Sequence, residues 1–191
     1  LVGAIMPMLE LSKSAQQTFF FIADLHSLNA VKDPKAITQN TLTLAAAFIA
    51  LGLDIEKTFL FRQSDVPELY QIAGMLQNIT PKGLMNRAHA YKAQLDKNAA
   101  EQQDPDAGIN MGLYNYPLLM AADILTFKAD LVPVGKDQQQ HIEFARDIAG
   151  YFNQAYGCDY LKAPEGYIQE DSKSIPGLDG RKMSKSYQNT I

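Results

Sequence analysis

Short runs of β-branched and aromatic residues alternate along this chain with longer segments of helical periodicity. The runs cover residues 18–26, 57–63 and 130–135. They are apolar on both faces, which is typical of strands in a parallel sheet that has helices packed on each side. The sequence therefore predicts an α/β fold built on an open, doubly wound parallel sheet.

Helix signals lie between these strands. Asp33 is a favourable N-cap and Pro34 a favourable first residue, so a helix is predicted that ends at Gly52. Ser64 and Asp65 are predicted to cap the following helix. Helices are predicted over residues 1–11, 34–51, 66–76, 116–127 and 137–156.

Chain length limits the domain organisation. The 191 residues are enough for one domain with a full hydrophobic core and too few for two large ones. A polar, weakly periodic segment over about residues 70–115 is predicted to be an insertion of helices and loops within that domain. Residues 158–191 are predicted to be rich in loops.

Composition excludes several classes of protein. The apolar content of 47% and charged content of 20% are those of an ordinary globular protein. Charged or polar residues interrupt every apolar stretch before the roughly 20 residues that a bilayer span needs, so no membrane contact is expected. A single cysteine, Cys158, precludes an internal disulfide and favours a cytoplasmic location. The net charge of −4 argues against nucleic acid as the sole ligand.

Polar residues follow each predicted strand. In open α/β sheets ligands bind beyond the carboxyl ends of the strands, which directs attention to residues 24–26, 62–65 and 135–138. His26, in the first of these segments, has two readings: a ligand contact at the strand end, or a loop cap. The three histidines and Cys158 show no spacing typical of metal ligands, so no metal site is predicted.

The predicted helix over residues 116–127 carries one acidic residue. Tyr116, Met120 and Asp123 are spaced four and three apart, so they share a helix face. A carboxylate among Ala, Met, Ile and Leu is costly to bury without a donor or cation as its partner. One reading is a pocket for a flat apolar ligand with a single N–H or O–H. In the other, the two larger side chains belong to the core and the carboxylate bonds a neighbouring backbone group.

A glycine turn follows the third strand. Gly135 allows a ligand to approach the backbone, and Asp137 is the predicted cap of the next helix. Free amides at a helix start favour an anion or a sugar hydroxyl. Gln138 and His141 lie three apart on the first turn. The alternative is an ordinary strand-to-helix turn without a ligand.

A cationic, hydroxyl-rich stretch, GRKMSKS, lies near the C-terminus. Lys182 and Lys185 are point charges on long stems, and Ser184 and Ser186 add hydroxyl donors. A flexible loop of this kind can close over the polyphosphate that leaves in phosphoryl or nucleotidyl transfer. The alternative is a solvated basic tail.

These residues resemble a known family. The pentapeptide KMSKS, residues 182–186, is the complete signature of class I aminoacyl-tRNA synthetases. The stretches TFFFIADLHSL, YPLLMAADIL, VPVGKDQQQHIEFARDIA and GLDGRKMSKS are similar, in that order, to bacterial tryptophanyl-tRNA synthetases. The resemblance is weakest over about residues 78–108. It implies that residues 1–191 form a Rossmann-like catalytic domain.

The resemblance also implies roles for individual residues. Asp123 would accept the indole N–H of tryptophan, and Met120 would pack on the ring. Further positions that match the tryptophan pocket are Tyr116, His26, Gln138, Ile124, Val132 and Val134. Positions that match the ribose and adenine sites of ATP are Gly135, Lys136, Asp137 and Ile175. All five positions of the signature would bind ATP: Lys182, Met183, Ser184, Lys185 and Ser186. Three of them would be catalytic: Lys182, Ser184 and Lys185.

The implied reaction has two steps. The carboxylate of L-tryptophan attacks the α-phosphorus of ATP, which is bound with Mg²⁺, while Lys182 and Lys185 stabilise the departing pyrophosphate. The tryptophanyl-adenylate then passes its acyl group to tRNA(Trp). Neither a protein nucleophile nor a tightly bound cofactor is needed. The family is homodimeric, so a cytoplasmic homodimer is expected.

Two family features are absent from the sequence: the HIGH-type motif and the helical anticodon-binding domain. We therefore expect a fragment, incomplete at both ends and inactive by itself. Two other readings stay open: a tyrosine-specific relative, and a non-catalytic synthetase-like protein that binds an amino acid or nucleotide. The MAAD helix favours tryptophan, and the intact Lys182 and Lys185 argue against a non-catalytic protein.

Overall fold

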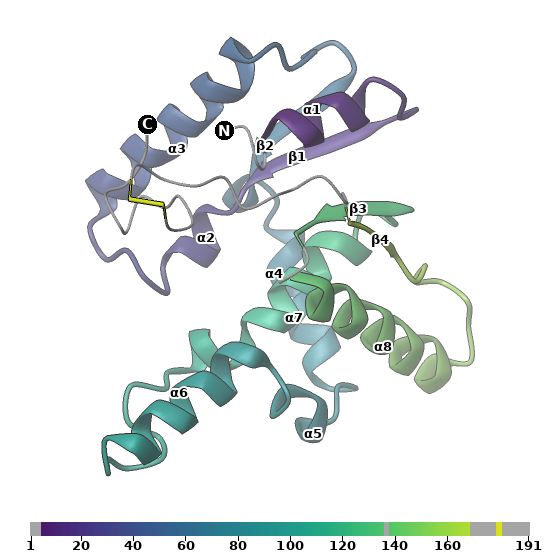
Figure 1. Ribbon diagram of the computed structural model, residues 1–191. Helices are drawn as coiled ribbons and strands as arrows, with labels where there is room; N and C mark the ends of the chain where they lie inside the picture. The colour runs from purple at the N-terminus through teal and green to yellow at the C-terminus, as the bar shows by residue number, and fades with distance from the viewer. Residues whose placement is uncertain (1–4, 136–137, 169–178, 181–191) are drawn as a thin grey trace.

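The computed structural model describes residues 5–135, 138–168 and 179–180 (Figure 1). The first half of the chain contains two strands and their helices. These elements are α1 (Ile5–Ser12), β1 (Thr18–Ile22), α2 (Asp24–Ser27), α3 (Pro34–Ala50), β2 (Thr58–Arg62) and the 3-10 turn η1 (Gln63–Asp65). Asp33 caps α3 as predicted, because its carboxylate accepts from the backbone N–H of Lys35, and Gly52 adopts a positive φ of 91° just past the helix end.

The second half is mainly helical. Its elements are α4 (Glu68–Gln77), α5 (Lys82–Met85), α6 (His89–Ala100), α7 (Met111–Leu125), β3 (Leu131–Val134), α8 (Gln139–Tyr156) and β4 (Glu165–Ile168). Gly157 ends α8 in the left-handed conformation, as predicted. None of the helices in the described ranges is both long and apolar enough to cross a membrane.

The strands are parallel, which confirms the α/β prediction. Within the described residues they form two separate two-stranded sheets. In the first, β1 pairs with β2 from Thr18 opposite Thr58 to Ile22 opposite Arg62. In the second, β3 pairs with β4, with Leu131 opposite Glu165. Strand β4 lies where the sequence predicts only loops. It is four residues long and mostly exposed, so its pairing with β3, rather than an apolar pattern, stabilises it.

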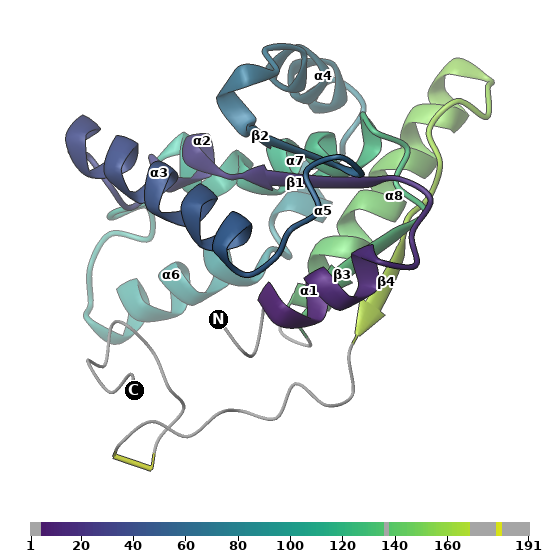
Figure 2. The same cartoon turned by 90° about the horizontal axis from the view of Figure 1, so that it is seen from above.

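One face of the first sheet is covered and the other only in part, although the apolar strands predict cover on both: Phe19 and Phe59, on the second face, are 38% and 56% exposed. Figure 2 shows α1 and α3 on one side of β1 and β2, and α4 and α7 on the other. On the first side Phe20 packs edge-on against Phe48 of α3 at a centroid distance of 5.3 Å. On the second, Phe127 contacts Phe19 at 4.8 Å and Phe61 at 5.4 Å.

The main core lies between α4, α7 and α8. Three of its fully buried side chains are Leu76, Leu125 and Ile148, one from each helix. The apolar stripe predicted for the last helix is buried in α8: Ile142, Ala145, Ile148 and Ala149, with Phe152 packed against them. This packing holds α7 rigidly, and α7 carries the acidic residue singled out from the sequence.

The predicted capping of α4 is wrong. Pro67 occupies its N-cap position, and neither Ser64 nor Asp65 bonds its first turn. Ser64 instead donates its backbone N–H and its hydroxyl to the carboxylate of Asp24, at 3.0 and 2.5 Å. Asp65 pairs with the guanidinium of Arg62. Charged partners outside the helix therefore replace the predicted cap bonds, and the Ser64–Asp24 bonds connect the end of β2 to the end of β1.

Candidate functional site

The carboxylate of Asp123 is buried within α7. The residue is 5% exposed, and its neighbours Ala121, Ala122 and Ile124 belong to the main core. A carboxylate at such a place is stable only with hydrogen-bond donors around it. The fold therefore has to supply a donor from another element.

That donor is the side-chain amide of Gln63. Its Nε2 lies 2.8 Å from both Oδ1 and Oδ2 of Asp123. Gln63 begins η1, directly after β2, and is fully buried. The bond is a side-chain contact across 60 residues, so the reading in which the carboxylate bonds a neighbouring backbone group is wrong.

His26 completes the cluster from the end of β1. Its Nδ1 lies 3.0 Å from Nε2 of Gln63 and 3.7 Å from Oδ2 of Asp123. Its backbone N–H donates to Oε1 of Gln63 at 3.2 Å. The carboxyl ends of both parallel strands thus lie beside the face of α7 that carries Asp123. This is the edge of the sheet at which the topology predicts a ligand site.

Burial alters the acid–base properties of this cluster. It raises the pKa of Asp123 to about 7, and the hydrogen bond from Gln63 opposes that rise. Burial also lowers the pKa of His26, against a smaller opposing contribution from the Tyr116 backbone. At neutral pH the imidazole is therefore neutral, and the carboxyl group is close to its titration midpoint.

Tyr116 links the cluster to α8. Its hydroxyl lies 3.1 Å from Nε2 of His141, and its ring meets that of His26 edge-on at 6.3 Å. Burial raises the pKa of the phenol, so the hydroxyl keeps its proton. Tyr116, His26 and Asp123, which the resemblance assigns to one pocket, thus lie close together. His141 is an additional residue in contact with this cluster, and the sequence analysis places it only on the first turn of the helix that follows the third strand.

The predicted apolar positions lie in the main core or pack against it. Met120, one turn before Asp123, is half-buried and packs against the main core. Val132 and Val134 are also half-buried, two apart on β3, so they share one face of that strand. Ile124 lies in the main core itself. The apolar positions that the resemblance assigns to the tryptophan pocket therefore pack in or against the main core.

The predicted turn after β3 is present in part. Gly135 is exposed, and its carbonyl accepts from the backbone N–H of Gln138 at 2.8 Å. The prediction that Asp137 caps the next helix is wrong, because α8 begins at Gln139 and Gln138 is its N-cap residue. Several predicted ATP-site residues lie outside the described residues: Lys136, Asp137, Ile175, Lys182, Met183, Ser184, Lys185 and Ser186.

Gln63 is the central residue that the sequence reasoning missed. Its segment, residues 62–65, was indicated by the strand-end rule. A glutamine has no charge or motif to distinguish it there from Ser64 or Asp65. Only the position of α7, packed beside β2, shows that this amide faces Asp123.

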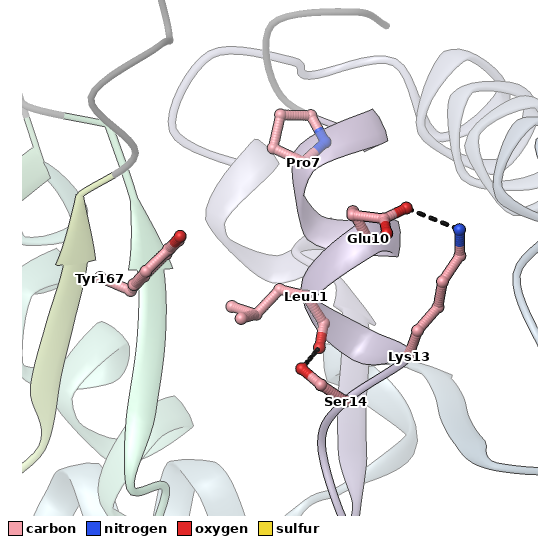
Figure 3. Close-up of a pocket in the computed structure, with 6 residues that line it drawn as sticks. All are labelled: Pro7, Glu10, Leu11, Lys13, Ser14 and Tyr167. Carbon is pink, nitrogen blue, oxygen red and sulfur yellow. Dashed lines mark hydrogen bonds and ion pairs between the residues drawn. The ribbon is translucent and has the colours of Figure 1, made fainter.

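A cavity of about 380 Å³ lies elsewhere, between α1 and β4 (Figure 3). Its lining is Pro7, Glu10, Leu11, Lys13, Ser14 and Tyr167. Glu10 pairs with Lys13 at 2.6 Å, and the hydroxyl of Ser14 donates to the carbonyl of Leu11, so these polar groups bond within their own segment. None of the Asp123 cluster lines it. No group of metal-binding side chains occurs among the residues that the structure describes.

The whole chain matches one family model, "tRNA synthetases class I (W and Y)", over residues 1–191. Curated relatives include the tryptophan–tRNA ligases of Xanthomonas campestris and Bordetella pertussis. Both are 54% identical to this chain, over 100% and 99% of its length and 44% and 42% of theirs. The chain thus spans less than half the length of these two curated relatives.

Solved structures agree. Tryptophanyl-tRNA synthetase from Campylobacter jejuni, complexed with ADP and tryptophan, superposes with a TM-score of 0.86 at 45% identity, over 99% of this chain and 56% of that one. Tyrosyl-tRNA synthetase from Archaeoglobus fulgidus, at 24% identity and a TM-score of 0.67, shares the fold. The match over the full length of the chain, with parallel strands that bring Asp123, Gln63 and His26 together, shows that this chain belongs to the class I tRNA synthetases of the tryptophan and tyrosine type.

Proposed function

We propose that this chain carries the amino-acid-binding part of an enzyme that activates L-tryptophan with ATP and transfers it to tRNA(Trp). The observation that carries the proposal is the buried acceptor Asp123, held by Gln63 beside the half-buried Met120. Indole is flat, apolar and has a single N–H. It would satisfy one lone acceptor without bringing a second polar group into the pocket.

The same acceptor would supply selectivity. Phenylalanine has no ring donor, so it would leave a desolvated carboxylate with an unused lone pair, at a cost of about 1–3 kcal/mol. Tyrosine has a donor, but on a single ring and at a different place. The curated relatives cited above carry the tryptophan name, which supports tryptophan over tyrosine.

ATP would bind at the turn that Gly135 opens. The N-terminus of α8 follows this turn, and a helix start favours phosphate or ribose hydroxyl groups. The Campylobacter relative binds ADP and tryptophan together, which supports two adjacent subsites. We assign the ribose to residues 135–137, the adenine to Ile175, and the β- and γ-phosphates to Lys182 and Lys185 of the KMSKS stretch.

In the first step the carboxylate of tryptophan attacks the α-phosphorus of the ATP–Mg²⁺ substrate in line, and pyrophosphate leaves. The role of this chain is to position the amino acid and to neutralise charge on the leaving group. The adenylate then esterifies the terminal ribose of tRNA(Trp), and AMP leaves. We further propose that the enzyme is a cytoplasmic homodimer, with residues 70–115 as an insertion in its catalytic domain.

The test is tryptophan-dependent exchange of pyrophosphate into ATP by the full-length protein. Exchange with tryptophan, but not with tyrosine or phenylalanine at the same concentration, is the expected result. Exchange driven by tyrosine would favour the tyrosine-specific reading. Binding of tryptophan without any exchange would favour a non-catalytic binding protein.

A further inference from the structure

The amide of Gln63 is fully used within the cluster. The residue is 0% exposed, so no solvent shares its hydrogen bonds. Nε2 carries two hydrogens and faces the carboxylate of Asp123 and Nδ1 of His26. Oε1 accepts from the backbone N–H of His26 at 3.2 Å. A single side chain therefore contacts both candidate ligand-binding groups.

These contacts fix which way the amide points. A carboxylate accepts only, so the Gln63 atom at 2.8 Å from both its oxygens is the NH₂ group. One amide hydrogen serves Asp123. The other is available to Nδ1 of His26 at 3.0 Å, closer than the 3.3 Å from that nitrogen to Oε1. In this arrangement Nδ1 accepts, and the neutral imidazole carries its proton on Nε2.

We propose that Gln63 is a positioning residue for ligand recognition, because one amide hydrogen orients the carboxylate of Asp123 and the other fixes His26 as the Nε2–H tautomer. The site then holds one acceptor, Asp123, in a fixed orientation, beside an imidazole of fixed tautomer. The proposal rests on the proposed function, in which Asp123 receives the N–H of tryptophan. It adds the residue whose hydrogen bond favours the ionised form of the acceptor and fixes the orientation of its carboxylate.

Few other groups act on the charge of Asp123. The titratable side chains that face it are His26 from α2 and, on its own helix, Tyr116, which bonds His141 of α8. The charged side chains of the helices packed on α7 are exposed: Glu68 of α4, Lys82 of α5, Lys92, Asp96 and Lys97 of α6, and Glu143, Arg146 and Asp147 of α8. Gln63 is the one cause that lowers the pKa of Asp123 against its burial. Its removal should leave the carboxyl group protonated to higher pH.

Two variants separate this role from simple packing. Gln63→Met keeps the shape and loses both polar functions. Gln63→Glu keeps an acceptor for the His26 N–H but places a second carboxylate beside Asp123, which also raises the pKa of the pair. The glutamate variant decides the question if the methionine variant fails to fold. Gln140→Met is the matched control, because Gln140 bonds the backbone of Arg87 and His89, away from the cluster.

The first measurement needs no ligand. In ¹⁵N NMR of the full-length protein, His26 should show a protonated Nε2 and an unprotonated Nδ1, and it should keep this pattern in Gln140→Met. In Gln63→Met the tautomer preference should be lost. A wild-type His26 with its proton on Nδ1, or a pattern unchanged by Gln63→Met, would overturn the assignment.

The second measurement is tryptophan affinity from pH 6 to pH 9. Both Gln63 variants should move the acid limb of the binding curve upward by about one pH unit or more, with affinity recovering at the alkaline end. Affinity for 3-benzothienylalanine, which has sulfur in place of the indole N–H, should lack this acid limb. Equal, pH-independent losses for both ligands would reduce Gln63 to a packing residue. If the wild type binds no tryptophan, the proposed function fails, while the NMR result still decides the role of Gln63.

Discussion

The amide nitrogen of Gln63 lies 2.8 Å from each carboxylate oxygen of Asp123, although 60 residues separate them in the chain. This contact joins the end of β2 to the last turn of α7. It makes burial of an acidic group compatible with a packed core, because the donor replaces part of the hydration that the carboxylate loses. The site and the fold are therefore stabilised by the same bond.

The first prediction concerns the core that holds α7. Ile148→Ala, at a fully buried position of α8, should lower the free energy of unfolding by about 2–5 kcal/mol, since it removes buried methyl groups and leaves a cavity. Ile49→Ala, at a 54% exposed position of α3, is the matched control and should cost less than about 1 kcal/mol. Urea unfolding of the three proteins provides the comparison. Similar losses at both positions would show that the α7–α8 core is not packed as described.

The second prediction concerns stability and pH. Asp123 keeps its proton to about pH 7 when folded but ionises near 3.8 when unfolded. The folded chain therefore binds more protons between these values, and stability falls as pH rises through that window. Relative to Asp123→Asn, which does not titrate, the wild type should lose up to about 4 kcal/mol between pH 4 and pH 7. Urea unfolding at several pH values measures this difference.

Asp65→Asn is the control for that series. Asp65 is exposed, and its pairing with Arg62 lowers the pKa of its carboxyl group below 3.8. Its contribution is lost only as pH falls further, so this variant and the wild type should keep a constant difference from pH 4 to pH 7. If the stability difference between the wild type and Asp123→Asn were also constant over this pH range, the buried carboxyl group would titrate normally.

How far the sequence predicts this structure differs between elements. The three predicted strands, the capped start of α3 and the apolar stripe of α8 are present, because each depends on local propensity or periodicity. Strand β4 was missed, because its pairing with β3 depends on tertiary context. The cap of α4 was wrong, because Asp24 takes the donors of Ser64 from 40 residues away.

The site shows the same division. Helical spacing placed Tyr116, Met120 and Asp123 on one face, and the strand-end rule indicated His26. Gln63 was not predicted, because its role exists only once β2 and α7 pack together. Long-range polar pairing of this kind leaves no periodic trace in a single sequence.

The third prediction separates binding from chemistry. Lys185→Ala, in the KMSKS stretch, should slow adenylate formation by about tenfold or more, because one cation would no longer stabilise the departing pyrophosphate. Tryptophan affinity should stay near the wild-type value. Single-turnover kinetics and equilibrium titration of the full-length protein measure the two quantities. Loss of affinity with normal chemistry would contradict the assigned role. Lys128→Ala is the matched lysine control, because the ammonium of Lys128 lies over the ring of Tyr160. It should change neither the rate of adenylate formation nor the affinity for tryptophan.

The fourth prediction concerns His26. The conservative change His26→Asn offers an amide where the imidazole lies and should weaken tryptophan binding by less than about tenfold, whereas His26→Ala also leaves an amide hydrogen of Gln63 without its acceptor and should cost more. Calorimetric titration compares them. Equal effects of the two changes would show that this side chain only fills space.

The most direct test of the central claim compares two ligands on two proteins. Tryptophan and 3-benzothienylalanine differ mainly in the indole N–H, and Asp123→Ala removes its proposed acceptor. The wild type should prefer tryptophan by about 1–3 kcal/mol in a calorimetric titration at pH 8, and Asp123→Ala should show no preference. An equal preference for tryptophan in both proteins would contradict the assignment of Asp123 as the group that recognises the ligand.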